Sequence, residues 1–317
     1  MPLDLSYDEI CTQFDRLISN GIINYQPNKP ILVVDGGMTV RSHQHPLISV
    51  QFSFHLVESL KTKPQAEDAP ETKSSLTDGA NTQPMSFGPG SDIANDHPDI
   101  CITTVNETHY LVINKFPVFR PMLLLLTVDS YRRQHEPLVL EDLEAAWSTI
   151  CGLREEHYVF FNCTVLAGSS RGHKHLQVIP APGKREGYDE AFKLFPDEDT
   201  APKTGPSFVH FLQRFEDLPE GCVKSGEHML EIYQRLLQQA RDALVLPTEV
   251  VPCPHNFVLT RRWMMVIPRR AKEFHGITAN APGMMGSIYI WNHDQLDAWK
   301  EIGPMKALAE LGLPREN

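Results

Sequence analysis

Two hydrophobic periodicities alternate along the chain and predict a mixed α+β protein. Apolar residues that recur every three or four positions are typical of helices, whereas strict alternation or a short, wholly apolar run is typical of strands. The predicted helices span residues 7–20, 141–153, 226–244 and 294–311. The predicted strands span residues 49–57, 101–105, 109–114, 122–128, 157–168, 173–179, 207–215, 255–260, 262–268 and 286–292. Connections of hairpin length dominate, so we expect a largely antiparallel sheet.

One long segment, residues 61–98, lacks either periodicity. It is rich in Pro, Ser, Thr, Asp, Glu and Gly and holds almost no large apolar side chains. Such a composition does not offset the entropy lost on ordering, so we predict a flexible insertion within a domain. We divide the chain into an N-terminal region, residues 1–200, which contains this insertion, and a C-terminal region, residues 201–317.

Charge and cysteine content narrow the class of protein. The 40 acidic residues exceed the 29 basic ones and give a formal net charge of −11, which disfavours a general nucleic-acid or membrane-surface binder. The six cysteines include no C-x-x-C pair, which is typical of a reduced compartment. Residues 1–15 do not have the pattern of a targeting peptide, and the apolar run 122–128 is too short to cross a membrane. We expect a cytoplasmic protein, with the nucleus as an alternative, that binds neither nucleic acid nor membrane.

The segment 168–177, GSSRGHKHLQ, fits three familiar chemistries poorly. GSSRG matches a serine-nucleophile elbow, but the alternating strand pattern after it excludes the helix that an elbow requires. A Walker phosphate loop fails because the second glycine comes one position early and no Ser or Thr follows the lysine. The H-x-H pair can bind zinc on a strand, but no third ligand stands at a telling spacing. Two histidines hydrogen-bonded within a sheet are the structural alternative.

The strand period of the same segment favours nucleotidyl transfer. On a strand, His173, His175 and Gln177 share one face, and the apolar residues Leu176 and Val178 take the other. A neutral imidazole, with an ordinary pKa of about 6.5, is a good nucleophile towards phosphorus near neutral pH. Its attack gives a nucleotidyl-histidine and splits one transfer into two steps. The Gly/Ser turn before it exposes N–H and hydroxyl groups that hold phosphate oxygens.

These residues carry a resemblance to a known family. H-x-H-x-Q, at 173–177, is the signature of the transferase branch of the histidine-triad superfamily, whose hydrolase branch has a third histidine in place of Gln177. Within that branch the chain resembles the fungal ATP adenylyltransferases, also called diadenosine tetraphosphate phosphorylases. The similar segments are residues 59–64, 108–118, 141–147, 160–177, 256–269, 276–287 and 302–314.

The resemblance implies a fold, a reaction and a set of site residues. The fold is histidine-triad-like, with two interleaved halves, antiparallel sheets and flanking helices; the N-terminal region carries the motif and the C-terminal region completes the nucleotide site. The reaction converts diadenosine tetraphosphate and phosphate reversibly to ADP and ATP, with His175 as the nucleophile, His173 holding its hydrogen-bond geometry and Gln177 as the third catalytic residue. The implied substrate-binding residues are Lys63, Asn114, Lys115, Asn162, Gly168, Ser169, Ser170, Arg171, Gln177, Asn280, Ala281, Pro282 and Ser287. We also expect a monomer without a tightly bound cofactor, with Mg²⁺ only as counter-ion of the polyphosphate.

Four departures from the family pattern leave other functions open. Arg171 stands where the family usually has Gln, and Met122 where a His usually follows N-K-F; Trp291 replaces a Lys and His255 a Tyr. The alternatives are a dinucleoside polyphosphate hydrolase, a nucleotide-binding protein without turnover, and a hexose-phosphate uridylyltransferase.

Overall fold

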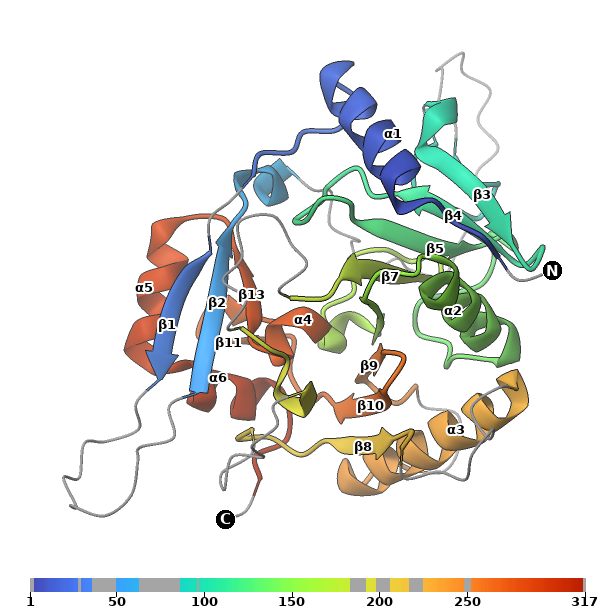
Figure 1. The fold of residues 1–317 in the computed structure, drawn as a ribbon. Coiled ribbons are helices and arrows are strands. Elements are labelled where there is room, and N and C mark those ends of the chain that lie inside the picture. The colour runs from blue at the N-terminus through green and yellow to red at the C-terminus, as the bar shows by residue number, and fades with distance from the viewer. Residues whose placement is uncertain are drawn as a thin grey trace, which may run out of the picture.

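The centre of the molecule is an eight-stranded sheet (Figure 1). The computed structural model describes residues 3–27, 30–35, 50–62, 86–95, 97–182, 192–197, 206–216, 225–247 and 252–315. The strand order is β3-β4-β5-β7-β6-β9-β10-β8, and every neighbouring pair is antiparallel, as predicted. The strands are β3 (Cys101–Val105), β4 (His109–Ile113), β5 (Leu123–Thr127), β6 (His157–Cys163), β7 (His175–Pro180), β8 (Phe211–Arg214), β9 (His255–Leu259) and β10 (Trp263–Pro268).

A second, three-stranded sheet joins the two ends of the chain. Its middle strand β2 (Val50–Leu56) is antiparallel to β1 (Ile31–Asp35) and parallel to β13 (Ser287–Ile290). The strand β1 was not predicted, and the parallel pair is an exception to the antiparallel expectation. It arises because β2 and β13 come from opposite halves of the chain and are not joined by a hairpin. A short hairpin of β11 (Glu273–Phe274) and β12 (Ile277–Thr278) comes between β10 and β13 in the sequence.

The two halves of the chain interleave in both sheets, which confirms the predicted fold. Strands β8, β9 and β10 extend the sheet that β3 to β7 form, and β13 completes the sheet of β1 and β2. The predicted boundary at residue 200 falls in the segment 198–205, which lies outside the described residues, so this division stays a prediction.

Helices pack on both sides of the large sheet, so its central strands are apolar on both faces. Side chains of β10 alternate between two cores: Met264 and Val266 face one, and Met265 and Ile267 face the other. The first core includes α1 (Tyr7–Ser19), α2 (Leu140–Gly152) and α3 (Gly226–Ala243); the second includes α4 (Ala281–Met284), α5 (His293–Ile302) and α6 (Pro304–Leu311) (Figure 1). Short 3₁₀ turns are η1 (Glu58–Thr62), η2 (Pro98–Ile100), η3 (Val165–Ala167) and η4 (Phe195–Asp197). No helix within the described ranges is long and apolar enough to cross a membrane.

Several element boundaries differ from the prediction for local reasons. The single helix predicted over 294–311 is two helices, because Gly303 takes a left-handed φ of 87° and Pro304 has no N–H to continue the first helix. Strand β6 ends at Cys163 rather than at Gly168, since Thr164 adopts a φ of 73° and the chain turns into η3. Strand β8 is shorter than predicted, and β7 begins at His175 instead of His173.

The last part of the segment predicted as a flexible insertion is placed in the structure, and the flexibility of the segment stays a prediction. Residues 63–85 and 96 lie outside the described residues, but 86–95 are placed against the fold. Phe87 is buried, and a Cβ added to Gly88 or Gly90 would lie 2.7 Å from the Oγ or 2.5 Å from the backbone oxygen of Ser130, respectively. Phe87 and Ile93 supply the apolar contacts of this part, and the glycine backbone makes the close approach to Ser130.

Candidate active site

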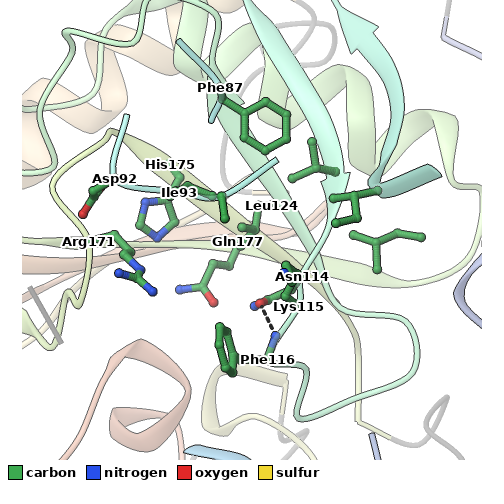
Figure 2. Close-up of a pocket in the computed structure, with 14 residues that line it drawn as sticks. Phe87, Asp92, Ile93, Asn114, Lys115, Phe116, Leu124, Arg171, His175 and Gln177 are labelled. Atoms are coloured by element: carbon green, nitrogen blue, oxygen red, sulfur yellow. Dashed lines mark hydrogen bonds between the residues drawn. The ribbon is translucent and has the colours of Figure 1, made fainter. Parts of the chain in front are cut away.

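A cavity of about 290 Å³ lies on one face of β4, β5 and β7, beneath residues 87–94 (Figure 2). Apolar side chains line one part of it: Phe87, Ile93, Ala94, Ile100, Val112, Ile113, Leu124 and Phe116. Polar side chains line the rest: Asp92, Asn114, Lys115, Arg171, His175 and Gln177. The structure therefore brings five of the predicted site residues together around one space: Asn114, Lys115, Arg171, His175 and Gln177.

The register of β7 places His175 and Gln177 on the same face, as predicted. His175 lies opposite Leu126 of β5, and Gln177 lies between Leu124 of β5 and Phe160 of β6. Both side chains reach the cavity, where Figure 2 shows His175 between Asp92 and Gln177. Leu176 and Val178 are buried in the core on the opposite face, also as predicted.

Three hydrogen bonds fix the orientation of His175. Its Nδ1 lies 2.8 Å from the carbonyl oxygen of His173. Because a carbonyl oxygen only accepts, Nδ1 carries the proton, and the lone pair of the neutral ring is on Nε2. Gln134 holds the backbone of the same residue: its Oε1 accepts from His175 N–H at 2.8 Å, and its Nε2 donates to the His175 carbonyl oxygen at 3.1 Å. The ring is thus set to present Nε2 as a nucleophile.

The side chain of His173 does not itself line the cavity, but its ring contacts Ser91, the neighbour of the cavity residue Asp92. The β7 ladder begins only at His175, and the His173 ring is fully buried. Its Nε2–H donates to the Thr127 carbonyl oxygen at 3.0 Å, and its Nδ1 accepts from the Ser91 hydroxyl at 2.8 Å. Burial lowers the pKa of His173, which agrees with a neutral ring in this arrangement. Its contribution to the geometry of His175 comes through its backbone carbonyl.

The turn at 168–171 offers donors to a phosphate group. Gly168 has a φ of 89°, and a Cβ there would lie 3.0 Å from the Ala279 carbonyl oxygen, so the position requires glycine. Among hydrogen bonds between described residues, none involves the hydroxyls of Ser169 and Ser170 or the N–H groups of Ser170 and Arg171. These groups, next to the Arg171 side chain on the cavity wall, suit phosphate oxygens.

Asp92 occupies the next two N–H groups of the same loop. Its carboxylate accepts from Gly172 N–H at 2.7 Å and from His173 N–H at 2.9 Å. Burial raises the pKa of Asp92, but these two hydrogen bonds and the charge of Arg171 outweigh burial and leave the pKa below its ordinary value. The carboxylate is therefore ionised at neutral pH and is committed to the backbone.

Asn114 and Lys115 follow the end of β4 at the cavity wall. The Oδ1 of Asn114 accepts from Phe116 N–H at 2.9 Å (Figure 2). This bond within the turn holds the backbone on either side of Lys115. The turn thereby places an ammonium group and an aromatic ring on the same wall.

Four other predicted binding residues do not line the cavity: Asn162, Asn280, Ala281 and Pro282. They connect the loops next to the turn at 168–171. The Oδ1 of Asn162 accepts from Ala281 N–H at 3.0 Å and from Asn256 Nδ2 at 2.8 Å. Asn280 caps α4 through Gly283 N–H at 3.2 Å. Ala281 and Pro282 are buried in that helix. These contacts tie the loop at 279–282 to β6 and to the turn at Gly168.

Two predicted residues remain, of which the structure describes only Ser287. Ser287 is fully buried on β13, where its Oγ lies 3.2 Å from His55 Nε2, and it does not line this cavity; its role in substrate binding stays a prediction. Lys63 lies outside the described residues.

A buried arginine, which sequence reasoning missed, links the loops around the turn. Nη1 of Arg269 donates to Asn256 Oδ1 at 2.7 Å, to the Ala279 carbonyl oxygen at 2.8 Å and to the Ala167 carbonyl oxygen at 3.3 Å. Burial lowers the pKa of Arg269. One side chain thus connects the residues just before Gly168 and just before Asn280.

Of the four departures from the family pattern, only Arg171 lines the cavity. Met122 is buried, and His255 lies under α3, where its Nδ1–H donates to the Cys253 carbonyl oxygen at 2.7 Å. Trp291 donates its backbone N–H to Gln295 Oε1 at 3.0 Å, beyond the end of β13. Three of the substitutions are therefore removed from the cavity wall.

Lys174 points away from the cavity and is fully buried behind the motif. Its Nζ lies 2.5 Å from Asp142 Oδ2 and 2.8 Å from the Pro137 carbonyl oxygen. The other oxygen of Asp142 lies 3.1 Å from His109 Nε2. Burial raises the pKa of Asp142, but the contacts with His109 and Lys174 outweigh burial and leave it below its ordinary value.

The described residues contain no group of three or more His, Cys, Asp or Glu side chains that could hold a metal ion. Within the cavity wall, Asp92 is the single carboxylate, and both of its oxygens accept backbone N–H groups. The donor set therefore does not fit a metal ion held by the protein alone.

The interleaved α+β fold, with His175 and Gln177 of β7 facing a cavity that Arg171 and Lys115 also line, defines a candidate nucleotidyltransferase. Residues 39–191 match the model of the Ap4A phosphorylase N-terminal domain, and residues 205–314 match that of the ATP adenylyltransferase C-terminal domain. The chain belongs to this family, the ATP adenylyltransferases or Ap4A phosphorylases.

Relatives in Saccharomyces cerevisiae cover most of the chain. Protein APA1 is 31% identical over 231 residues, 66% of this chain and 70% of the relative. Diadenosine 5′,5‴-P1,P4-tetraphosphate phosphorylase 2 is 26% identical over 301 residues, 85% of this chain and 86% of the relative. The crystal structure of yeast Ap4A phosphorylase Apa2 is similar in fold, with a TM-score of 0.72, 23% identity and coverage of 100% of this chain and 97% of that one. The structure of Apa2 in complex with Ap4A has a TM-score of 0.69, with 23% identity and full coverage of both chains.

Proposed function

We propose that the protein catalyses the reversible phosphorolysis of diadenosine tetraphosphate to ADP and ATP through an adenylyl group on His175. The observation that carries the proposal is the orientation of His175 on the cavity wall, with Nδ1 bonded to the His173 carbonyl group and Gln177 and Arg171 beside it. Membership of the phosphorylase family supports the choice of substrate. The relative named phosphorylase 2 and the Apa2 structures with Ap4A and with AMP support it as well.

In the first step, the lone pair on His175 Nε2 attacks the α-phosphorus of one adenylyl unit. A P–N bond forms, the bond between that phosphorus and its bridging oxygen breaks, and ATP leaves with the electron pair. The leaving group is a polyphosphate anion that departs near neutral pH without a protonating acid. The positive charge that develops on the ring is stabilised because Nδ1–H remains bonded to the carbonyl oxygen of His173.

The groups around the cavity stabilise the charge that gathers on the non-bridging oxygens. The amide of Gln177 donates from the same strand face, and the side chains of Arg171 and Lys115 supply positive charge. The hydroxyls of Ser169 and Ser170 add donors from the turn. Such preorganised donors act most strongly in the transition state, where the oxygens carry the most charge.

In the second step, an oxygen of inorganic phosphate attacks the adenylyl phosphorus. The P–N bond breaks, ADP forms, and Nε2 recovers its lone pair. Attack by water instead would release AMP, so the identity of the second product separates a phosphorylase from a hydrolase. The apolar part of the cavity, with Phe87, Ile93 and Leu124, suits the adenine base.

Mg²⁺ enters this proposal as the counter-ion of the polyphosphate, because the cavity wall offers no carboxylate that is not already bonded to backbone. We expect EDTA to slow turnover in proportion to the Mg²⁺ removed, and added Mg²⁺ to restore it fully. A metal that stays with the protein after dialysis against EDTA, measured by elemental analysis, contradicts this assignment.

The proposal includes a monomer in the cytoplasm, or in the nucleus. The five described cysteines are all free, which agrees with a reduced compartment. Light scattering during gel filtration tests the monomer, and a fluorescent fusion of the full chain tests the location.

The proposed reaction is tested with diadenosine tetraphosphate labelled at the α-phosphates. Without phosphate, we expect the label on the protein as an acid-labile, base-stable adduct that is absent from His175→Ala. With phosphate, ADP and ATP should appear in equal amounts. AMP and ATP in the presence of phosphate would identify a hydrolase, and binding without products a nucleotide-binding protein. Preference for a UDP-sugar in competition would identify a uridylyltransferase.

A further inference from the structure

The described end of the predicted insertion contacts the residue that orients His175. Asp92 accepts the N–H of His173 at 2.9 Å, and the Ser91 hydroxyl reaches the His173 ring at 2.8 Å. Figure 2 shows Asp92 beside Arg171 and His175 at the cavity wall. From these contacts we propose that Asp92 and Ser91 are positioning residues for the nucleophile, because they hold His173 while its carbonyl group holds the Nδ1 proton of His175. This inference rests on the proposed function in taking His175 as the nucleophile.

His173 is held at every polar group that does not face His175. Asp92 holds its backbone N–H, Ser91 its Nδ1, and the carbonyl group of Thr127 its Nε2. The peptide plane that follows therefore has a fixed direction, and its oxygen lies 2.8 Å from His175 Nδ1. Without the contacts from residues 91–92, His173 keeps the Thr127 carbonyl group at its ring, and the peptide plane keeps the bond from Lys174 N–H to the Arg132 carbonyl oxygen at 3.0 Å. A displacement of about 1 Å at a reacting group lowers a rate by roughly 10²-fold, so the support bears directly on catalysis.

The residues just before Asp92 are hydrogen-bonded to the loop that follows β5. Gly90 donates its N–H to Ser130 Oγ at 3.2 Å, and its carbonyl oxygen accepts from Arg133 Nη1 at 3.3 Å. Gly88, at a φ of 111°, and Gly90 approach Ser130 so closely that neither leaves room for a Cβ. Residues 88–92 are thus braced against the loop that follows β5, and the position of Asp92 relative to β7 is fixed.

The chemistry of the contact requires a carboxylate. Two consecutive N–H groups point at Asp92, and both of its oxygens accept, one from Gly172 and one from His173. An asparagine has one accepting oxygen and would turn an NH₂ group towards the other N–H. Hydrogen bonds to an ionised acceptor are also the stronger kind. Function should therefore fall in the order Asp, Asn, Ala at this position.

The test compares Asp92→Ala, Asp92→Asn and Ser91→Ala with the control Asp129→Asn. The exposed Asp129 accepts a backbone N–H within its own loop, from Tyr131 at 3.0 Å, and its side chain does not contact the motif. The first measurement is the ¹⁵N spectrum of labelled histidine rings, with His175 assigned from His175→Ala; it reports which ring nitrogen carries the proton and needs no substrate. The second is the single-turnover rate of adenylyl transfer, together with the affinity for AMP.

We expect the wild type and Asp129→Asn to hold the Nδ1–H form of His175. Asp92→Ala should show a mixture that includes the Nε2–H form and a roughly tenfold slower adenylyl transfer, while AMP affinity changes by less than about threefold. Asp92→Asn should be intermediate, and Ser91→Ala should slow transfer by about threefold. If Asp92→Ala does not fold, the Asn and Ser91 variants, which keep the backbone of the segment, carry the test.

The inference is overturned if the Asp92 variants melt at a lower temperature but keep the wild-type tautomer of His175 and the wild-type rate of adenylyl transfer. Residues 91–92 would then have a purely structural role. A changed tautomer in a protein whose wild type forms no adenylyl-histidine supports the positioning role and removes the proposed function. The two ideas therefore fail separately.

Discussion

Lys174 and His175 are neighbours in the motif, yet they belong to opposite sides of the sheet. His175 lines the cavity, and its neighbour is fully buried against Asp142 and the Pro137 carbonyl group. In front, polar groups face a space of about 290 Å³ that a substrate can fill. Behind, Lys174, Asp142 and His109 bond to one another, so nothing there is offered to a ligand.

The difference teaches that the two polar sets have different tasks on one strand. Because side chains alternate along a strand, a slip of one residue would exchange the two faces and put an ammonium group where the imidazole belongs. The buried ion pair makes such a slip costly, since it would lose its partner in the core. The rear set, Lys174, Asp142 and His109, thus fixes the register of β7. The front set, His175 and Gln177, depends on that register to face the cavity. The predictions below separate these tasks, in order of the expected free-energy change.

The largest effect is expected for His175→Ala. Removing the proposed nucleophile should lower kcat by about 10⁴-fold or more, since the covalent step is lost. Affinity for AMP and thermal stability should change far less than kcat, because Gln134 holds the backbone at this position whichever side chain it carries. Steady-state kinetics and calorimetry measure these quantities. Turnover close to wild type would falsify the assignment of His175.

Lys174→Met should produce the opposite pattern. Losing the cation leaves the Asp142 carboxylate buried with one partner fewer, and the free energy of unfolding should fall by about 3–5 kcal/mol. The molecules that remain folded should keep their kcat, because Lys174 does not line the cavity. Urea unfolding and kinetics at low temperature measure both, and the double variant with Asp142→Asn should recover part of the stability. A stable but inactive Lys174→Met would show that the rear face takes part in the chemistry.

Gln177→Ala should affect turnover more than binding. Losing one preorganised donor to the α-phosphate lowers kcat by about 10²–10³-fold, with a smaller loss of ground-state affinity. Gln177→His restores the third histidine of the hydrolase branch and should raise the share of AMP among the products. If Gln177 were a surface amide without a catalytic role, Gln177→Ala would change kcat and affinity by no more than a factor of about two. Kinetics equal to wild type for Gln177→Ala would remove this residue from the front set.

The smallest effect concerns His255, on the rear side under α3. Its Nε2 accepts from the Tyr233 hydroxyl at 3.0 Å, and burial lowers its pKa to about 4. Since the unfolded chain binds the proton near pH 6.5 and the folded chain does not, stability is full above pH 6.5 and is lost as the pH falls towards 4. The loss from this residue between pH 8 and pH 5 is about 2 kcal/mol.

Urea unfolding at both pH values measures that loss. His255→Gln should reduce the pH dependence, and the exposed His293→Gln is its matched control. An equal slope in His255→Gln and wild type contradicts the assignment of the acid sensitivity to His255.

The sequence by itself determined the elements whose pattern is local and the face that carries the chemistry. The alternation at 175–178 places His175 and Gln177 together because a strand repeats every two residues, whatever it pairs with. The apolar runs of β5 and β6 likewise marked strands buried on both faces. The family resemblance through H-x-H-x-Q also needed no structure, because it depends on residue type and spacing alone.

Only the tertiary structure decided which distant groups support the motif. Asp92 and Gln134 lie in irregular segments, where no period marks them, and Thr127 ends β5. Each makes a hydrogen bond with the motif in which one partner is a backbone group, which any residue type would offer. The contact of Ser287 with His55, 232 residues away along the chain, was likewise visible only in the structure. A periodic pattern records which side of an element is buried; it does not record which loop, tens of residues away, supplies the hydrogen bond that a buried N–H or carbonyl group requires.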